Sequence, residues 1–94
     1  MSYSLAFRES ALKEWKRLDP PIREQFKKKL AERLQRPRVE SARLSGMPDC
    51  YKIKLKSAGY RLVYQIEDRT VTVVVVAIGR RERNLAYKIA LKRI

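Results

Sequence analysis

Lysine occupies every second position from residue 52 to residue 56, and the neighbouring residues of this segment are apolar. Side chains of a β-strand point alternately to opposite faces, so a strand here would place Lys52, Lys54 and Lys56 in one row. Such a row adds nothing to stability, because like charges repel each other. It becomes favourable where a polyanion lies across it, and the phosphate backbone of a nucleic acid is a polyanion of this kind. The segment therefore predicts a phosphate-binding face.

A second set of cations lies further along the chain. Arg61 is expected on the same face as the lysines, because the pairing predicted for the next strand gives it their orientation. Arg80, Arg81 and Arg83 follow the end of an apolar strand, a position where loops often carry functional residues. Tyr87 comes next, inside a predicted helix. The alternative for the three arginines is a solvated loop, and the alternative for Tyr87 is a helix residue packed on the sheet.

The residue types exclude several kinds of catalytic site. The chain has no histidine, so it lacks the imidazole acid–base pair and most zinc sites. The acidic residues show no clustering like that of a two-metal nuclease, and there is no glycine-rich phosphate loop. We therefore expect neither a metal nor a cofactor. Any catalysis has to come from lysine, arginine, tyrosine and glutamate side chains.

One reaction suits these side chains, namely cleavage of RNA by attack of its own 2′-hydroxyl on the adjacent phosphate. The enzyme must then accept one proton, donate another and stabilise extra negative charge on the phosphoryl oxygens. Lysine and arginine stabilise that charge directly. A tyrosine can act as the base if neighbouring cations lower its pKa, which is ordinarily about 10. Such a base is poorly matched to neutral pH, so we expect the enzyme to need help in positioning its substrate.

The composition is that of a small, basic protein. Its 94 residues suffice for a single domain, which we place at residues 1–94. Lysine and arginine number 23 against 10 acidic residues, which gives a net charge of +13. This charge favours nucleic acid, an acidic protein or an anionic membrane, the alternative being a solubilising surface. The longest apolar run is too short to span a bilayer and the N-terminus has no signal-peptide pattern, so we expect a cytoplasmic protein without a membrane partner.

Cys50 is the only cysteine of the chain, so no disulfide can form within it, and a reducing compartment is expected. Cys50 lies two residues before Lys52, so in a strand its side chain would point to the same face as the lysines. Cations there would lower the pKa of the thiol and make it reactive. The chain offers no histidine to act as its base, so we favour the alternative of an inert cysteine.

The apolar spacing predicts four strands and three helices. Residues 2–7 alternate like a short strand. Residues 9–17 are a predicted helix, whose apolar stripe comprises Ala11, Leu12, Trp15 and Leu18 at helical spacing. Asp19 and the two prolines after it begin a second helix, which Pro37 ends. The remaining predicted elements are strands at 50–56, 60–67 and 70–78 and a helix at 82–94.

The second helix combines an apolar stripe with a basic face. Ile22, Phe26, Leu30 and Leu34 recur at every fourth position and form the stripe. The short link to the first helix predicts an antiparallel hairpin that buries this stripe on a sheet. We expect the basic face to contact the backbone of a nucleic acid, with a solvated face as the alternative. Its cations include Lys27, Lys28, Lys29 and Arg33.

Burial of one sheet face suggests a strand register. We expect Lys56 opposite Arg61 and Leu55 opposite Leu62, which keeps apolar side chains on one face and cations on the other. A slip of one residue would place Leu62 among the lysines. A two-residue turn at positions 68 and 69 would add three valines to the apolar face, namely Val71, Val73 and Val75.

Together the elements predict an α+β fold. A small, antiparallel-rich, four-stranded sheet would carry the N-terminal helical hairpin on one face and the C-terminal helix on the other. The strand at 70–78 is apolar on both faces, which is typical of a central strand covered twice. The C-terminal helix offers two apolar stripes for the second face, Leu85 with Ile89 and Tyr87 with Leu91.

Three segments of the chain closely resemble the RelE toxins of bacterial toxin–antitoxin systems. They are residues 47–55, 59–65 and 79–83, and residues 11–15 and 23–25 agree as well. The resemblance extends over essentially the whole chain without gaps. It implies the RelE-like fold, which is a small sheet with a helical hairpin on one face and a C-terminal helix.

The resemblance also implies a ribosome-dependent endoribonuclease that cuts messenger RNA in the A site of the 70S ribosome and inhibits translation. The active-site residues of the family fall on Lys52, Lys54, Arg61, Arg81 and Tyr87, and every residue type matches. Tyr87 would be the general base, Arg81 would stabilise the cleaving phosphate, and the other three would bind and neutralise it. Contacts to RNA, including the 16S rRNA, are expected from Lys27, Lys28, Lys29, Arg33, Lys56, Arg80 and Arg83.

The same resemblance implies the binding partners of the chain. An antitoxin of the RelB type would wrap the toxin, cover its basic face and displace the C-terminal helix. The pair would bind its own operator DNA through the antitoxin, with the toxin as corepressor. Two alternatives from other classes stay open. One is a non-catalytic toxin of the same fold that poisons DNA gyrase, and the other is a basic nucleic-acid-binding corepressor.

Overall fold

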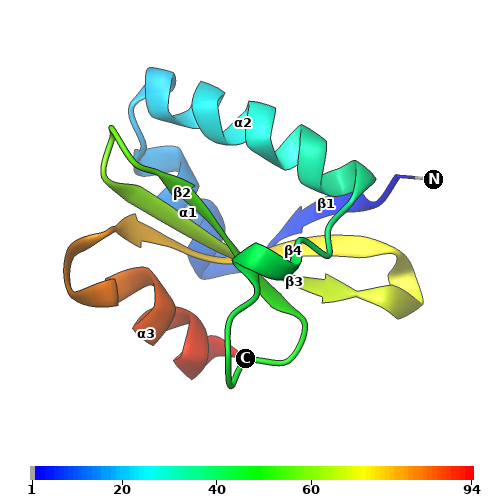
Figure 1. The fold of residues 1–94 in the computed structure, drawn as a ribbon. Helices are drawn as coiled ribbons and strands as arrows, with labels where there is room; N and C mark the ends of the chain where they lie inside the picture. The colour runs from blue at the N-terminus through cyan, green and yellow to red at the C-terminus, as the bar shows by residue number, and fades with distance from the viewer. Residues whose placement is uncertain (1) are drawn as a thin grey trace.

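The computed structural model describes residues 2–94, which form one four-stranded sheet with helices on both of its faces (Figure 1). The strands are β1 (Ser4–Phe7), β2 (Cys50–Leu55), β3 (Tyr60–Glu67) and β4 (Thr72–Arg80). The helices are α1 (Glu9–Arg17), α2 (Pro20–Gln35) and α3 (Leu85–Arg93). Short 3₁₀ turns lie at Glu40–Ala42, Asp68–Thr70 and Glu82–Asn84. The predicted α+β class is confirmed.

The strands follow the order β1-β4-β3-β2 across the sheet. β1 runs parallel to β4, whereas β4 with β3 and β3 with β2 pair antiparallel. The sheet is therefore antiparallel-rich, and β4 is a central strand, as its apolar sequence predicted. β2, which carries Lys52 and Lys54, lies at one edge of the sheet, and Lys56 follows the last residue of this strand.

The helical hairpin of α1 and α2 covers one face of the sheet. Ala11 of α1 and Phe26 and Leu30 of α2 are buried there, in one apolar cluster with residues of β2, β3 and β4. These are the positions that helical spacing assigned to the buried stripes. Leu12, which the sequence also placed on the α1 stripe, is instead 37% exposed.

α3 covers the opposite face of the sheet, on the side away from α2 (Figure 1). It packs on the sheet through the fully buried Ala86 and Ala90, in a cluster that includes Val63. The larger stripes predicted for this helix are only partly used, since Leu85 and Leu91 are 46% and 56% exposed. Alanines at the contact let the helix lie close to the strands, because they occupy little space between the two layers.

Arg93 ties the last turn of α3 to α1 and β4. Its guanidinium pairs with Glu14 of α1 at 3.0 Å and donates to the carbonyl oxygen of Val76 at 2.8 Å. Val76 has no directly paired residue in β3, because a β-bulge interrupts the β3–β4 register there. Glu14 also accepts a hydrogen bond from the Ile78 N–H at 3.1 Å. The position of α3 therefore depends on side chains from the helical hairpin as well as its own.

β2 and β3 pair two residues away from the predicted register. Lys54, not Lys56, lies opposite Arg61. The turn decides this, because Gly59 adopts a left-handed φ of 73° and donates its N–H to the Leu55 oxygen at 2.8 Å. A shift of two residues leaves each side chain on its predicted face, so the cations still share one face. The sheet face predicted for each side chain was right, and the residue predicted to lie opposite it on the neighbouring strand was wrong.

The connection from β3 to β4 is longer than the predicted two-residue turn. A 3₁₀ turn at Asp68–Thr70 is followed by Val71 with a left-handed φ of 51°. Val71 is consequently exposed, and its predicted place on the apolar face was wrong. Val73 and Val75 are fully buried on that face, as predicted. β4 begins at Thr72 for the same reason, two residues later than expected.

Cys50 is fully buried beside α3, although its side chain points to the same face of the sheet as Lys52 and Lys54. Burial in apolar surroundings raises the pKa of its thiol to about 11, and Asp49 adds to this while Arg8 opposes it. The inert role is supported, because only a thiolate is reactive. Among the described residues, no helix is long and apolar enough to cross a membrane.

Candidate active site

Lys52 and Lys54 of β2, Lys56 just after it and Arg61 of β3 form the floor of the candidate site. Lys54 and Arg61 are directly opposite each other in the antiparallel pair, which brings their side chains together on one face. Lys52 precedes them on β2 and is half-buried, whereas Lys54 is exposed. Like-charge repulsion lowers the pKa of Lys54, with Lys52 as the largest cause, followed by desolvation, Arg61 and Lys56. Cation crowding of this kind is relieved when an anion binds.

Arg81 joins this floor from the loop after β4. Its backbone N–H donates to the Gly59 oxygen at 2.9 Å, so the loop is fixed to the turn between β2 and β3. The Arg81 side chain helps to line a cavity of about 270 Å³ in which cations of three segments converge. The cavity is lined by Lys54, Leu55, Lys56, Tyr60, Arg61 and Arg81. Residues that are far apart in sequence thus surround a volume that suits a phosphate group.

Tyr87 approaches the same cations from α3. The guanidinium carbon of Arg61 lies 4.9 Å from the centroid of the Tyr87 ring, which is a cation–π contact. The Tyr87 hydroxyl is buried and has no hydrogen-bond partner among residues 2–94. Burial raises the pKa of this hydroxyl above its usual value, and the opposing effect of Arg61 is smaller. In the isolated chain, therefore, the cations do not lower the pKa of Tyr87 as a tyrosine base would require.

The backbone between Arg81 and Tyr87 has an unusual conformation. Arg83 and Asn84 are consecutive residues with φ of 53° and 54°, in the left-handed region that non-glycine residues seldom occupy. Asn84 precedes the first residue of α3 but does not cap the helix with its side chain. Instead its Oδ1 accepts a hydrogen bond from Nη1 of Arg61.

The basic face of α2 adjoins the lysine row. Lys27, Lys28 and Lys29 are exposed, and Lys27 pairs with Glu24 at 3.3 Å. A second cavity of about 350 Å³ joins this face to β2. Its lining comprises Lys29, Arg33, Ser41, Ala42, Lys52, Ile53, Lys54 and Lys56. Lys54 and Lys56 line both cavities, so cations extend continuously from α2 to Arg81.

Arg33 differs from the other cations of α2. Its Nη1 donates to the Lys52 carbonyl oxygen at 3.0 Å and to the Tyr64 hydroxyl at 2.9 Å. The same hydroxyl donates to the Pro37 oxygen at 2.6 Å. Arg33 thus fixes α2 to the edge strand, and its Nη1 is already engaged within the protein. Sequence pattern had placed it simply among the RNA contacts.

Two further predicted contacts lie near the end of β4. Arg80 is exposed and its guanidinium carbon lies 5.2 Å from the centroid of the Tyr60 ring. Arg83 is exposed in the strained loop. Tyr60 and Asn84 are the lining and contact residues that sequence reasoning missed. Tyr60 could have been found as an aromatic residue next to Arg61 in the sequence. Asn84 could have been found as an asparagine just before a predicted helix, since asparagine tolerates a left-handed backbone.

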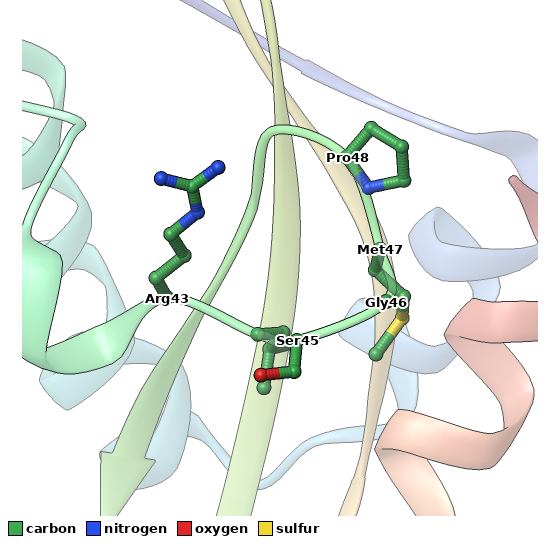
Figure 2. A pocket seen from close by; sticks show the side chains of 6 residues that line it. Arg43, Ser45, Gly46, Met47 and Pro48 are labelled. Atoms are coloured by element: carbon green, nitrogen blue, oxygen red, sulfur yellow. The ribbon is translucent and has the colours of Figure 1, made fainter.

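A further hollow lies away from these cations. It has a volume of about 530 Å³ and is formed by the loop at 43–48, with Arg43 as its one cation (Figure 2). None of the predicted site residues lines it. Within residues 2–94, no group of three histidine, cysteine, aspartate or glutamate side chains is placed to hold a metal ion. The chemistry offered by the basic cavities is phosphate binding, with a tyrosine hydroxyl at their border.

Comparison with known proteins agrees with this architecture. Residues 5–85 match the family model described as the ParE toxin of the type II toxin–antitoxin system parDE. The chain is 58% identical to the mRNA interferase toxin RelE of Escherichia coli K12 over 94 residues, which cover 100% of this chain and 99% of that protein.

Solved structures show the same relationship. A mutant of E. coli RelE in the free state has a TM-score of 0.92 and 56% identity, covering 100% of this chain and 99% of that one. RelE in the intact E. coli RelBE toxin–antitoxin complex has a TM-score of 0.84 and 58% identity, covering 87% of this chain and 100% of that one. The chain belongs to the RelE/ParE family of type II toxins, and its similarity is to the RelE members.

Proposed function

We propose that this chain is the toxin of a type II toxin–antitoxin system and acts as a ribosome-dependent endoribonuclease. It cleaves messenger RNA in the A site and thereby inhibits translation. The relatives that are 58% identical over the whole chain are named mRNA interferases. The observation that carries the proposal is the convergence of Lys54, Arg61 and Arg81 on one cavity, with Tyr87 stacked against Arg61.

The cleaved bond is the P–O5′ bond of the messenger, broken by attack of the neighbouring 2′-hydroxyl on phosphorus. Lys52, Lys54 and Arg61 bind the phosphate and neutralise its charge. Arg81, fixed at the border of the cavity through its backbone, stabilises the additional charge of the transition state. The new bond from the 2′-oxygen to phosphorus leaves a 2′,3′-cyclic phosphate, and the departing 5′-oxygen takes up a proton with the assistance of Arg81. Neither a metal nor a cofactor takes part in this scheme.

Tyr87 is the proposed general base, which removes the proton of the 2′-hydroxyl. In the isolated chain its hydroxyl is buried, and this burial raises its pKa above the usual value. We therefore place the active arrangement after RNA has entered, when the 2′-hydroxyl becomes the hydrogen-bond partner that Tyr87 lacks. A base that becomes competent only with substrate in position accounts for dependence on the ribosome.

The basic face of α2 is the proposed contact to ribosomal RNA. The exposed Lys27, Lys28 and Lys29 provide charge for a sequence-independent contact with phosphates. The cavity lined by Lys29, Lys52 and Lys56 continues that surface into the site. Arg80 and Arg83 extend it on the other side, and we place this toxin in the cytoplasm, where ribosomes are.

An antitoxin of the RelB type is the proposed inhibitor. The RelE of the solved E. coli complex, which is 58% identical to this chain, is bound to RelB. The antitoxin would cover the basic face and displace α3, and the complex would bind operator DNA through the antitoxin. Displacement of α3 would remove Tyr87 from Arg61 and thus separate the two halves of the site.

Primer extension on a defined messenger tests the proposal. The purified chain is incubated with that messenger, either naked or on ribosomes stalled with an empty A site. We expect cuts only on ribosomes and only in the A-site codon. Tyr87→Phe should reduce them by about 10²–10⁴-fold. Tyr3→Phe, which removes a hydroxyl bonded to Asp68 at the far end of the sheet, should leave them unchanged.

The outcomes separate the function classes. Rapid cutting of naked messenger would contradict the dependence on the ribosome. Full cutting by Tyr87→Phe would contradict the role of the tyrosine. If no cuts appear under either condition, inhibition of DNA gyrase becomes the next activity to assay, and the proposed endoribonuclease is rejected.

A further inference from the structure

Asn84 is the side chain that connects the cations of the sheet with the helix that carries Tyr87. It lies at the junction of the strained loop and α3, and it contacts Arg61, which is far away in sequence. An asparagine just before a helix ordinarily caps it by accepting from the N–H groups of the first turn. Asn84 makes no such cap, so its side chain is engaged by Arg61 instead.

The direction of this contact is fixed by chemistry. A guanidinium has only donors, so the oxygen of the Asn84 amide must face Arg61. The second restraint on Arg61 is the ring of Tyr87, at 4.9 Å from the guanidinium carbon. The amide and the ring together limit the rotation of a side chain that is otherwise long and flexible. Arg61 is therefore held at the border of the cavity before any phosphate arrives.

The backbone at Asn84 supports a role beyond packing. Arg83 and Asn84 both occupy the left-handed region, where each non-glycine residue is strained. Asparagine tolerates this conformation better than most residues. The Asn84 side chain is exposed, so it does not contribute to the core. Strain that brings an exposed amide onto a phosphate-binding arginine is typical of a functional arrangement.

We propose that Asn84 is a positioning residue that holds Arg61 for phosphate binding and couples it to Tyr87. The inference rests on the proposed function, since it assigns Arg61 the phosphate. Asn84 acts by holding the Arg61 guanidinium in place, and it does not itself contact the RNA. Movement of α3 would then displace Asn84 and Tyr87 together, so Arg61 would lose both of its restraints at once.

The structural part of the proposal is tested by NMR on the free chain, without any cleavage. Protons of Arg61 near the Tyr87 ring should be shifted upfield in the wild type. Asn84→Gly keeps the left-handed backbone without strain but removes the oxygen, so it should reduce this shift. Asn84→Asp keeps an oxygen acceptor and should restore it. An unchanged Arg61 signal in Asn84→Gly overturns the proposal.

The catalytic part is tested by a double-mutant cycle on ribosome-bound messenger. Asn84→Gly should lower the rate of the cleavage step roughly tenfold, because a phosphate-binding arginine that is no longer held in place stabilises the transition state less well. In an Arg61→Ala background, the same change should have no further effect, because Arg61 is the group through which it acts. An equal effect in both backgrounds, or none in either, overturns the coupling.

The two arms distinguish failure of this inference from failure of the proposed function. If the wild type does not cut messenger, the proposed function fails, and the NMR comparison alone then decides whether Asn84 positions Arg61. If the wild type cuts and Arg61→Ala impairs it, the proposed function survives. The cycle with Asn84→Gly then decides the inference.

Discussion

The guanidinium carbon of Arg61 lies 4.9 Å from the centre of the Tyr87 ring, so β3 and α3 meet at the proposed phosphate site. Tyr87 is brought there by the packing of α3 through alanines and by the pairing of Arg93 with Glu14. The contact leaves the Tyr87 hydroxyl buried and without a partner among the described residues. Because this buried hydroxyl makes no hydrogen bond, it lowers the free energy of unfolding of the chain when no substrate is bound.

Tyr87→Phe should separate activity from stability. It removes the orphaned hydroxyl, so the free energy of unfolding should stay unchanged or rise by up to about 1 kcal/mol. Cleavage on the ribosome should fall by about 10²–10⁴-fold, the usual cost of losing a general base. Urea unfolding and primer extension on the same preparation check both effects.

Tyr64→Phe is the matched control for that experiment. The Tyr64 hydroxyl is bonded to Arg33 and Pro37, so its loss should destabilise the chain by about 1–3 kcal/mol. A stabilised Tyr64→Phe together with a destabilised Tyr87→Phe would contradict this account of the two hydroxyls.

Arg33 and Lys29 should respond differently to substitution by methionine. Arg33→Met leaves the Lys52 oxygen and the Tyr64 hydroxyl without their donor and should lower the free energy of unfolding by about 1–3 kcal/mol. Lys29→Met changes an exposed side chain and should stay within about 0.5 kcal/mol.

Salt dependence of ribosome association checks the role of Lys29. Loss of one phosphate contact should reduce the slope of log affinity against log salt by about 1. An unchanged slope in Lys29→Met would remove this lysine from the RNA-binding surface, whatever its effect on stability.

Glu14→Gln should loosen α3. The carboxylate accepts from Arg93 and from the Ile78 N–H, and both side chains of the ion pair are less than a quarter exposed, at 23% and 22%. Losing the charge should cost about 1–3 kcal/mol. Amide hydrogen exchange should accelerate in residues 85–93 more than in β3. Uniform acceleration across the chain would show that the pair stabilises the whole fold and not α3 in particular.

Cys50 should make the chain less stable at alkaline pH. Burial raises the pKa of its thiol to about 11, so the folded state binds the proton more tightly than the unfolded state. This contribution is present below the unfolded pKa and is lost as pH rises through the folded one. Between about pH 8 and pH 10.5 the loss should be about 2 kcal/mol.

Denaturant titrations of the wild type and Cys50→Ala over that range provide the test. The variant lacks the thiol, so its stability should fall less steeply with pH than that of the wild type. Parallel pH profiles would show that the thiol ionises equally well in both states.

The sequence by itself determined the local elements and the sidedness of the cations. α1 and β3 have the predicted bounds, because helical and strand periodicities are properties of neighbouring residues. Lys52, Lys54 and Arg61 were placed on one face correctly even though the register was wrong, since a shift of two residues preserves parity.

Only the tertiary structure decided how these elements meet. The register depended on the left-handed Gly59, and the position of Tyr87 depended on how closely α3 packs on the sheet. Burial of the Tyr87 hydroxyl reversed the pKa shift expected from its cationic neighbours. The bond of Asn84 to Arg61 joins segments that the sequence separates. Such contacts arise where the sheet and α3 pack together, and they cannot be predicted from the spacing of residues along a single strand or helix.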